Sequence, residues 1–124
     1  MSQFHFPPRE LAVMSSLWKR GSASVSEVRD DLTEDLAYTS VLSALQTLEE
    51  KGYVRHEPEG RAYRYFPTIG ADAAGGSALL RIRDSIYHGS AERMVAQLLT
   101  DRNLSREELE RLRTLLADRL RQTP

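Results

Sequence analysis

The stretch at residues 37–52, AYTSVLSALQTLEEKG, constrains the fold more than any other part of the chain. Its apolar residues recur at the three- and four-residue spacing of one helix face; they are Tyr38, Val41, Leu42, Leu45 and Leu48. The opposite face carries short, uncharged polar side chains, which are Thr39, Ser40, Ser43, Gln46 and Thr47. Such a face suits the major groove of DNA, where base edges are read by hydrogen bonds. The alternative is an ordinary surface helix that is rich in serine and threonine.

Two further helices are predicted before this stretch. After a loose arm over residues 1–7, a helix over residues 9–20 follows Pro8 and stops at Gly21. Its predicted inward side chains are Leu11, Met14, Leu17 and Trp18. Ser24 and Glu27 have the spacing of a capping box, which predicts a helix over residues 25–32 with Val25, Val28 and Leu32 facing inward. A short loop then leads to the helix at residues 37–52, and this arrangement is typical of a helix-turn-helix.

After Gly52 the hydrophobic period changes to that of β-strands. Residues 53–57 are predicted to form a strand, residues 58–60 a turn, and residues 61–66 a return strand that ends at Pro67. A β-hairpin directly after a helix-turn-helix is a wing. The hairpin carries Arg55, His56, Arg61 and Arg64. Arginines at this place are positioned to meet phosphates or a minor groove. The alternative is a solvated hairpin whose arginines pair with Glu57 and Glu59.

The second half of the chain is predicted to be entirely helical. One helix covers residues 71–87, and its Gly75-Gly76 pair is a weak point that leaves a start after the glycines as the alternative. A short helix follows Ser90, and a last helix begins at a capping box formed by Ser105 and Glu108. The apolar side chains of these helices are predicted to form a dimer interface; they are Leu79, Ile82, Ile86, Val95, Leu98, Leu99, Leu109, Leu112 and Leu116. The alternative is that the helices pack on the N-terminal half as ordinary core.

Composition restricts the classes of function. The chain of 124 residues has a net charge of −1, and residues 1–67 hold eight Lys or Arg against ten Asp or Glu. A DNA-binding surface must therefore come from local clustering of charge. Cysteine is absent, and His5, His56 and His88 do not have metal-ligand spacing. We therefore predict no enzyme, no metal, no cofactor and no small-molecule substrate. No stretch has the length or apolarity of a signal sequence or membrane span, so we expect a cytoplasmic protein.

Taken together, these segments resemble the penicillinase-repressor family of winged-helix transcriptional regulators, which includes the β-lactamase, methicillin-resistance and copper-responsive repressors. The resemblance rests on PRELAVMSSLWKRG at 8–21, SVSEVRDDL at 24–32, AYTSVLSALQTLEEKGYV at 37–54, GRAYRYFP at 60–67 and MVAQLLTDRNLSREELERLRTLL at 94–116. It implies a mainly α fold with a small β-hairpin wing. It also implies a homodimeric repressor on a dyad-symmetric operator, with a winged helix-turn-helix domain at 1–68 and a helical dimerisation domain at 69–124.

Residue roles follow from the resemblance by position. The implied base readers are Thr39, Ser40, Ser43, Gln46 and Thr47; the implied wing contacts are Arg61 and Arg64, and Lys51 and Tyr63 complete the predicted DNA-binding set. The Cys-x-Cys pairs of the copper-responsive branch are absent. The Asn–Phe bond that is cleaved in the β-lactam-responsive branch corresponds to Gln97-Leu98. This leaves open cleavage by a membrane-bound sensor peptidase with a zinc centre, a different signal, or none.

A second hypothesis is a winged-helix protein-interaction module that does not bind DNA. The acidic balance of the first 67 residues supports it. It is favoured if acidic side chains line the proposed DNA face, and the residues to locate are Asp30, Asp31, Glu34, Asp35, Glu49 and Glu50.

Overall fold

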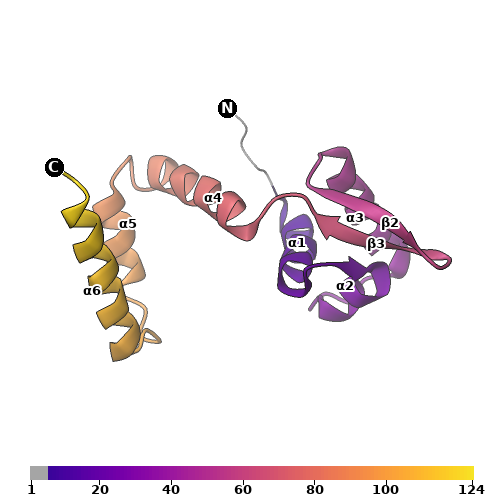
Figure 1. Cartoon of the computed structure of the whole chain (residues 1–124), viewed down its shortest axis with the longest axis horizontal. Coiled ribbons are helices and arrows are strands. Elements are labelled where there is room, and N and C mark those ends of the chain that lie inside the picture. Colours follow the sequence, from indigo (N-terminus) through magenta and orange to yellow (C-terminus); the bar gives the residue numbers. More distant parts are fainter. Residues whose placement is uncertain (1–5) are drawn as a thin grey trace. The chain divides into compact units, whose positions relative to one another are not determined.

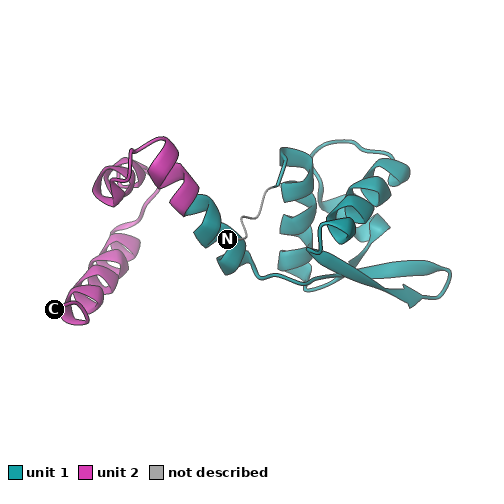
Figure 2. Ribbon diagram, turned by 90° about the horizontal axis from the view of Figure 1, so that it is seen from above, with its two compact units in different colours: residues 1–79 teal, residues 80–124 magenta. Residues whose placement is uncertain are grey.

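The computed structural model describes residues 6–124. Of the arm predicted over residues 1–7, the first five residues, including His5, lie outside the described part. The chain divides into two compact units, Met1–Leu79 and Leu80–Pro124 (Figure 2). The boundary between them falls within helix α4, and each unit is described by itself below.

The first unit is a winged helix (Figure 1). Its elements are α1 (Pro8–Arg20), β1 (Ala23–Ser24), α2 (Val25–Asp31), α3 (Tyr38–Glu50), β2 (Val54–Glu59), β3 (Ala62–Pro67) and the start of α4 (Ala71–Ser85). The three strands form an antiparallel sheet in the order β1-β3-β2. The predicted fold class and the helix-turn-helix followed by a hairpin are therefore confirmed.

One core holds the three helices against the sheet. Met14 and Leu17 from α1, Leu45 and Leu48 from α3, and Tyr65 from β3 are almost completely buried. These side chains come from elements far apart in the sequence, so removal of any one leaves a cavity in a shared core.

Two predicted core positions are wrong. Leu11 is 46% exposed, because the buried side of α1 is centred on Val13, Met14 and Leu17, and Leu11 falls outside that arc. Tyr38 is 39% exposed, because it is the first residue of α3 and lies beyond the packed turns of that helix.

The hairpin is longer than predicted. Pro58 and Glu59, which were expected in the turn, belong to β2, where Pro58 pairs with Tyr63 and Glu59 with Ala62. A proline is tolerated there because β2 is an edge strand. The turn is therefore formed by Gly60, whose φ is 63°, and Arg61, which places Arg61 at the very tip of the wing.

Asp31 at the end of α2 joins that helix to α1. Its Oδ2 accepts hydrogen bonds from Ser16 Oγ and Arg20 Nε, each at 2.7 Å, and its Oδ1 accepts one from Arg20 Nη2 at 2.8 Å. Ser16 is only 4% exposed, so its hydroxyl depends on this carboxylate. The hydrogen bonds from Arg20 and then from Ser16 hold the pKa of Asp31 well below its usual range.

We expect Asp31→Ala to lower the free energy of unfolding by about 1–3 kcal/mol at neutral pH, because the buried Ser16 hydroxyl loses its acceptor. The lowered pKa of Asp31 means that its stabilisation is complete above the carboxyl pKa of the unfolded chain, about 3.9, and is lost as the pH falls through the lower pKa of the folded state. Urea unfolding at neutral pH and at successively lower pH should show the difference between wild type and variant shrinking only below about pH 4. Asp30→Ala, at an exposed neighbouring carboxylate, is the control and should change stability little. A pH-independent difference would contradict the assignment.

The second unit contains the end of α4, α5 (Ala91–Leu98) and α6 (Arg106–Arg121). Ser90 Oγ accepts from the Arg93 N–H and caps α5, and Ser105 Oγ accepts from the Glu108 N–H and caps α6. Among residues 6–124, no helix combines the length and the apolarity needed to cross a membrane.

One limit of α4 differs from the prediction. The predicted start at Ala71 is confirmed and the alternative start after Gly76 is wrong, since the buried Ala74 donates its N–H to Gly70 O at the first turn. The glycine pair therefore lies inside the helix. At the other end α4 stops at Ser85, before His88 and Gly89, which both have positive φ.

Candidate nucleic-acid interface

Helix α3 has one buried and one open face, as its sequence predicts. Val41, Ala44, Leu45 and Leu48 are buried against the core. Of the predicted base readers, Thr39, Ser43 and Gln46 are exposed, whereas Ser40 and Thr47 are half-buried at the edges of the open face. Three hydrogen-bonding side chains thus project from successive turns of one helix.

The N-terminus of α3 has no side chain of its own that would neutralise the positive end of the helix dipole. Its N-cap residue, Ala37, has no side-chain acceptor, and no acidic residue lies in the first turn. The N–H groups of the first turn and the positive end of the helix dipole are therefore available to an anion such as a phosphate.

The cations of the hairpin have different environments. Arg55 Nη1 donates to Glu57 Oε1 at 2.8 Å, and its guanidinium lies 4.2 Å from the centre of the Phe66 ring. Arg64 is bound by acidic side chains as well, through Glu59 and Glu27. Arg61 is exposed in the turn and forms no ion pair with another described residue. The alternative of internally paired hairpin arginines thus describes Arg55 and Arg64, but not Arg61.

The other predicted DNA-binding residues lie close to α3. Lys51 Nζ donates to Glu10 Oε1 at 2.7 Å and so connects the end of α3 to α1. Tyr63 is 47% exposed, and its ring centre lies 4.6 Å from that of His56. His56 Nδ1 is 2.6 Å from Glu49 Oε2, which connects β2 to the C-terminal part of α3. The wing is therefore fixed against the helix that carries the predicted readers.

Three of the six acidic residues that would favour a protein-interaction module contact an arginine or histidine side chain. Asp31, Glu34 and Glu49 contact Arg20, Arg9 and His56, respectively. Asp30 and Asp35 are exposed outside α3. Glu50 follows Ser43 by seven positions and therefore lies on the same side of α3, at the far end from its N-terminus. One acidic side chain of the six thus shares the predicted reading face.

Two cations that were not among the predicted DNA-binding residues also lack an ion pair to another described residue and are therefore available to a phosphate. In residues 6–67, the Lys and Arg side chains without an ion pair to another described residue are Lys19, Arg29 and Arg61. Lys19 ends α1 and Arg29 lies on α2, and both are exposed. The sequence alone does not distinguish them from paired cations, because most of their counterparts pair with residues far along the chain. Within residues 6–124, no group of three His, Asp or Glu side chains is placed to hold a metal ion.

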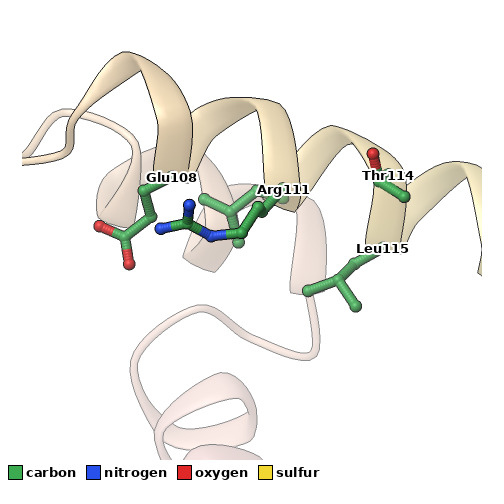
Figure 3. A pocket seen from close by; sticks show the side chains of 5 residues that line it. Glu108, Arg111, Thr114 and Leu115 are labelled. Atoms are coloured by element: carbon green, nitrogen blue, oxygen red, sulfur yellow. The ribbon is translucent and has the colours of Figure 1, made fainter.

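The predicted dimer-interface residues are left open within one chain. Eight of the nine are exposed and Leu112 is half-buried. A hollow of about 530 Å³ is lined by six of them, from α5 and α6, together with Arg113 and Leu115. A second hollow of about 450 Å³ follows α6, with Glu108, Arg111 and Leu115 along its side (Figure 3). Apolar surface of this extent on a small helical unit is typical of an association surface.

The Gln97-Leu98 pair lies at the C-terminal end of α5, with both side chains exposed. Gln97 O accepts hydrogen bonds from the N–H and the hydroxyl of Thr100. The bond between the two residues is thus accessible but held in helical geometry.

Comparison with known proteins places the chain among bacterial regulators. The family model described as penicillinase repressor matches residues 7–118. The penicillinase repressor of Bacillus licheniformis is 29% identical over 88% of this chain and 87% of its own length. The transcriptional regulator BlaI of Mycobacterium tuberculosis is 35% identical over 88% of this chain and 80% of its own. A solution structure of the DNA-binding domain of the repressor BlaI is 30% identical, with a TM-score of 0.50, and covers 56% of this chain and 90% of that one.

Proposed function

Because the chain belongs to the penicillinase repressor family, we propose that it is a sequence-specific DNA-binding transcriptional repressor that acts as a homodimer on a dyad-symmetric operator. The observation that carries the proposal is the open face of α3, which is uncharged from Thr39 to Thr47, begins without a side-chain cap and lies beside a wing whose tip bears an arginine without an ion pair to another described residue. The family's repressors and the BlaI DNA-binding domain support the same conclusion.

In this proposal α3 enters the major groove. Thr39, Ser43 and Gln46 read base edges, with Ser40 and Thr47 at the margin of the contact. Arg61 at the wing tip meets a phosphate, and the exposed Tyr63 lies next to it on the wing. Lys51 serves the interface through its ion pair with Glu10, which fixes the end of α3. The chain acts as a regulator rather than an enzyme, and it works in the cytoplasm, where operator DNA is found.

The dimer in this proposal is formed by residues 69–124, and DNA binding by residues 1–68. The exposed leucines of α5 and α6 would be covered by the same surface of a second copy, as a two-fold axis requires. Release of the operator would follow from damage to this interface. Cleavage at Gln97-Leu98 by a membrane-bound sensor peptidase would achieve it, after α5 unwinds locally to present the bond.

The first test is binding to a labelled duplex from the region upstream of the protein's own gene, compared with a scrambled duplex, by fluorescence anisotropy at several salt concentrations. We expect tight binding to the first duplex and weak binding to the second. If Lys19, Arg29 and Arg61 each neutralise one phosphate, the slope of log K against log salt should be about −2.7 per protomer and about −5.4 for a dimer. Equal binding to both duplexes, or none, would reject the repressor and favour the protein-interaction module.

A further inference from the structure

The guanidinium of Arg64 donates hydrogen bonds to three side chains of the first unit. Its Nε donates to both carboxylate oxygens of Glu59 at 3.1 Å, its Nη1 donates to Ser22 Oγ at 3.1 Å, and its Nη2 donates to Glu27 Oε1 at 3.1 Å. All three nitrogens are therefore engaged, and 27% of the side chain is exposed. A phosphate contact by Arg64 would require it to give up at least one of these partners.

Glu27, one of the two carboxylates that bind Arg64, is held in place by the start of α2. Its Oε1 accepts the Ser24 N–H at 2.9 Å while Ser24 Oγ accepts the Glu27 N–H at 3.2 Å, so the capping box of α2 holds the carboxylate in place. Arg20 Nη1 lies 3.6 Å from the other oxygen, Oε2. The Ser24 N–H and the two arginines lower the pKa of Glu27, which therefore keeps its charge.

Glu59, the other carboxylate that binds Arg64, lies next to the wing tip. Glu59 is the last residue of β2, and Gly60 and Arg61 follow it in the turn. Arg64 itself lies on the central strand β3, where it pairs with Ser24 of β1 and Glu57 of β2. One guanidinium thus connects the start of α2 to the end of β2, which directly precedes the turn that carries Arg61.

We propose that Glu27 and Arg64 are positioning residues that hold the wing at a fixed place relative to the helix-turn-helix, so that Arg61 reaches its phosphate. This inference rests on the proposed DNA binding and assigns Arg64 a different role from direct contact. A two-residue turn on an edge strand has few restraints of its own, and the Arg64–Glu59 contact supplies one next to Arg61.

The test is a double-mutant cycle of Arg61→Ala and Arg64→Ala, read as the salt dependence of binding to the upstream duplex. Loss of one phosphate contact in each protomer reduces the magnitude of the slope by about 0.9 per protomer, which is about 1.8 for the dimer. Between 50 mM and 200 mM salt, a dimer that lacks this contact therefore loses about 12-fold less affinity than the wild type does. If Arg64 acts through Arg61, each single variant reduces the magnitude of the dimer's slope by up to about 1.8, and the double variant reduces it no further. An additive reduction of about 3.6 for the dimer would show that Arg64 contacts DNA directly and would overturn the proposal.

Glu27→Gln is a second variant that keeps the capping acceptor but removes the charge that holds Arg64. Removal of an acidic charge near DNA should by itself strengthen binding. Positioning predicts the opposite, a weaker affinity and a slope like that of Arg64→Ala. Glu57→Gln is the matched control, because this wing carboxylate contacts Arg55 instead. Tighter binding by both glutamine variants would overturn the proposal.

Amide hydrogen exchange of the free protein gives a readout that does not depend on DNA. Arg64→Ala and Glu27→Gln should speed exchange at residues 60–62, whereas Glu57→Gln should not. Circular dichroism establishes that each variant is folded. A wild-type protein that binds no DNA would reject the proposed function, whereas unchanged exchange at the wing tip would reject the positioning role alone.

Discussion

The double variant Leu112→Asp/Leu116→Asp is expected to be monomeric and to lose affinity for a full operator by roughly 100-fold or more, since linked binding of two half-sites contributes a factor of about 10²–10⁴. Both leucines line the hollow between α5 and α6, and they are four residues apart on one side of α6. In the proposed dimer the substitutions bury two carboxylates without partners in each protomer, at a cost of several kcal/mol each. Sedimentation velocity gives the oligomeric state, and anisotropy gives the affinity.

Arg106→Asp is a suitable control for this variant. It changes the net charge by the same two units, but at a side chain that is 88% exposed at the start of α6, where an acidic residue suits the helix dipole. The control should remain a dimer. A dimeric Leu112→Asp/Leu116→Asp protein with a normal helical signal would show that the interface lies elsewhere.

Gln46→Ala is expected to abolish most of the discrimination at one base pair of the operator. A side-chain amide that bonds a base edge through two groups contributes about 1–3 kcal/mol of discrimination, which corresponds to roughly 5- to 150-fold in relative affinity. Gln46 is exposed in the middle of the open face of α3, and truncation there leaves the buried face intact. Binding should therefore weaken on the upstream duplex and change little on the scrambled duplex.

Arg61→Ala separates this effect from a general loss of affinity. That variant should weaken binding to both duplexes by a similar factor, because a phosphate contact is present whatever the sequence. A similar loss on both duplexes for Gln46→Ala would remove it from the reading set and leave Ser43 and Thr39 as the candidates to replace next.

The elements were predictable because their signals are local. The capping box of Ser24 and Glu27 forms as its spacing indicates, and the apolar period of α3 identifies Val41, Leu45 and Leu48 as core. Pro58 was predicted in the turn because proline is excluded from inner strands. It is tolerated in an edge strand, and the sequence does not show that β2 is one.

Local sequence signals did not show which hairpin arginines form ion pairs. Arg64 is bound by Glu27, which lies 37 positions earlier in the chain. Arg61 has equally close acidic neighbours in the sequence, yet it is exposed in the turn and forms no ion pair with a described residue. Hairpin cations of identical type thus acquire different environments from the register of two strands, and the register depends on a turn that was predicted at residues 58–60 and lies at residues 60–61.

Most Lys and Arg side chains of the DNA-binding half, residues 6–67, form ion pairs within the protein. This pairing affects how the protein is divided between its operator and unrelated DNA in a cell. Sequence-independent affinity comes from cations that neutralise phosphates, and only three per protomer lack an ion pair among the described residues of this half. A chromosome offers about 10⁶–10⁹ competing sites, so weak attachment to each of them matters as much as strong attachment to one. A small number of copies is then sufficient to keep an operator occupied, because few are withheld on unrelated DNA.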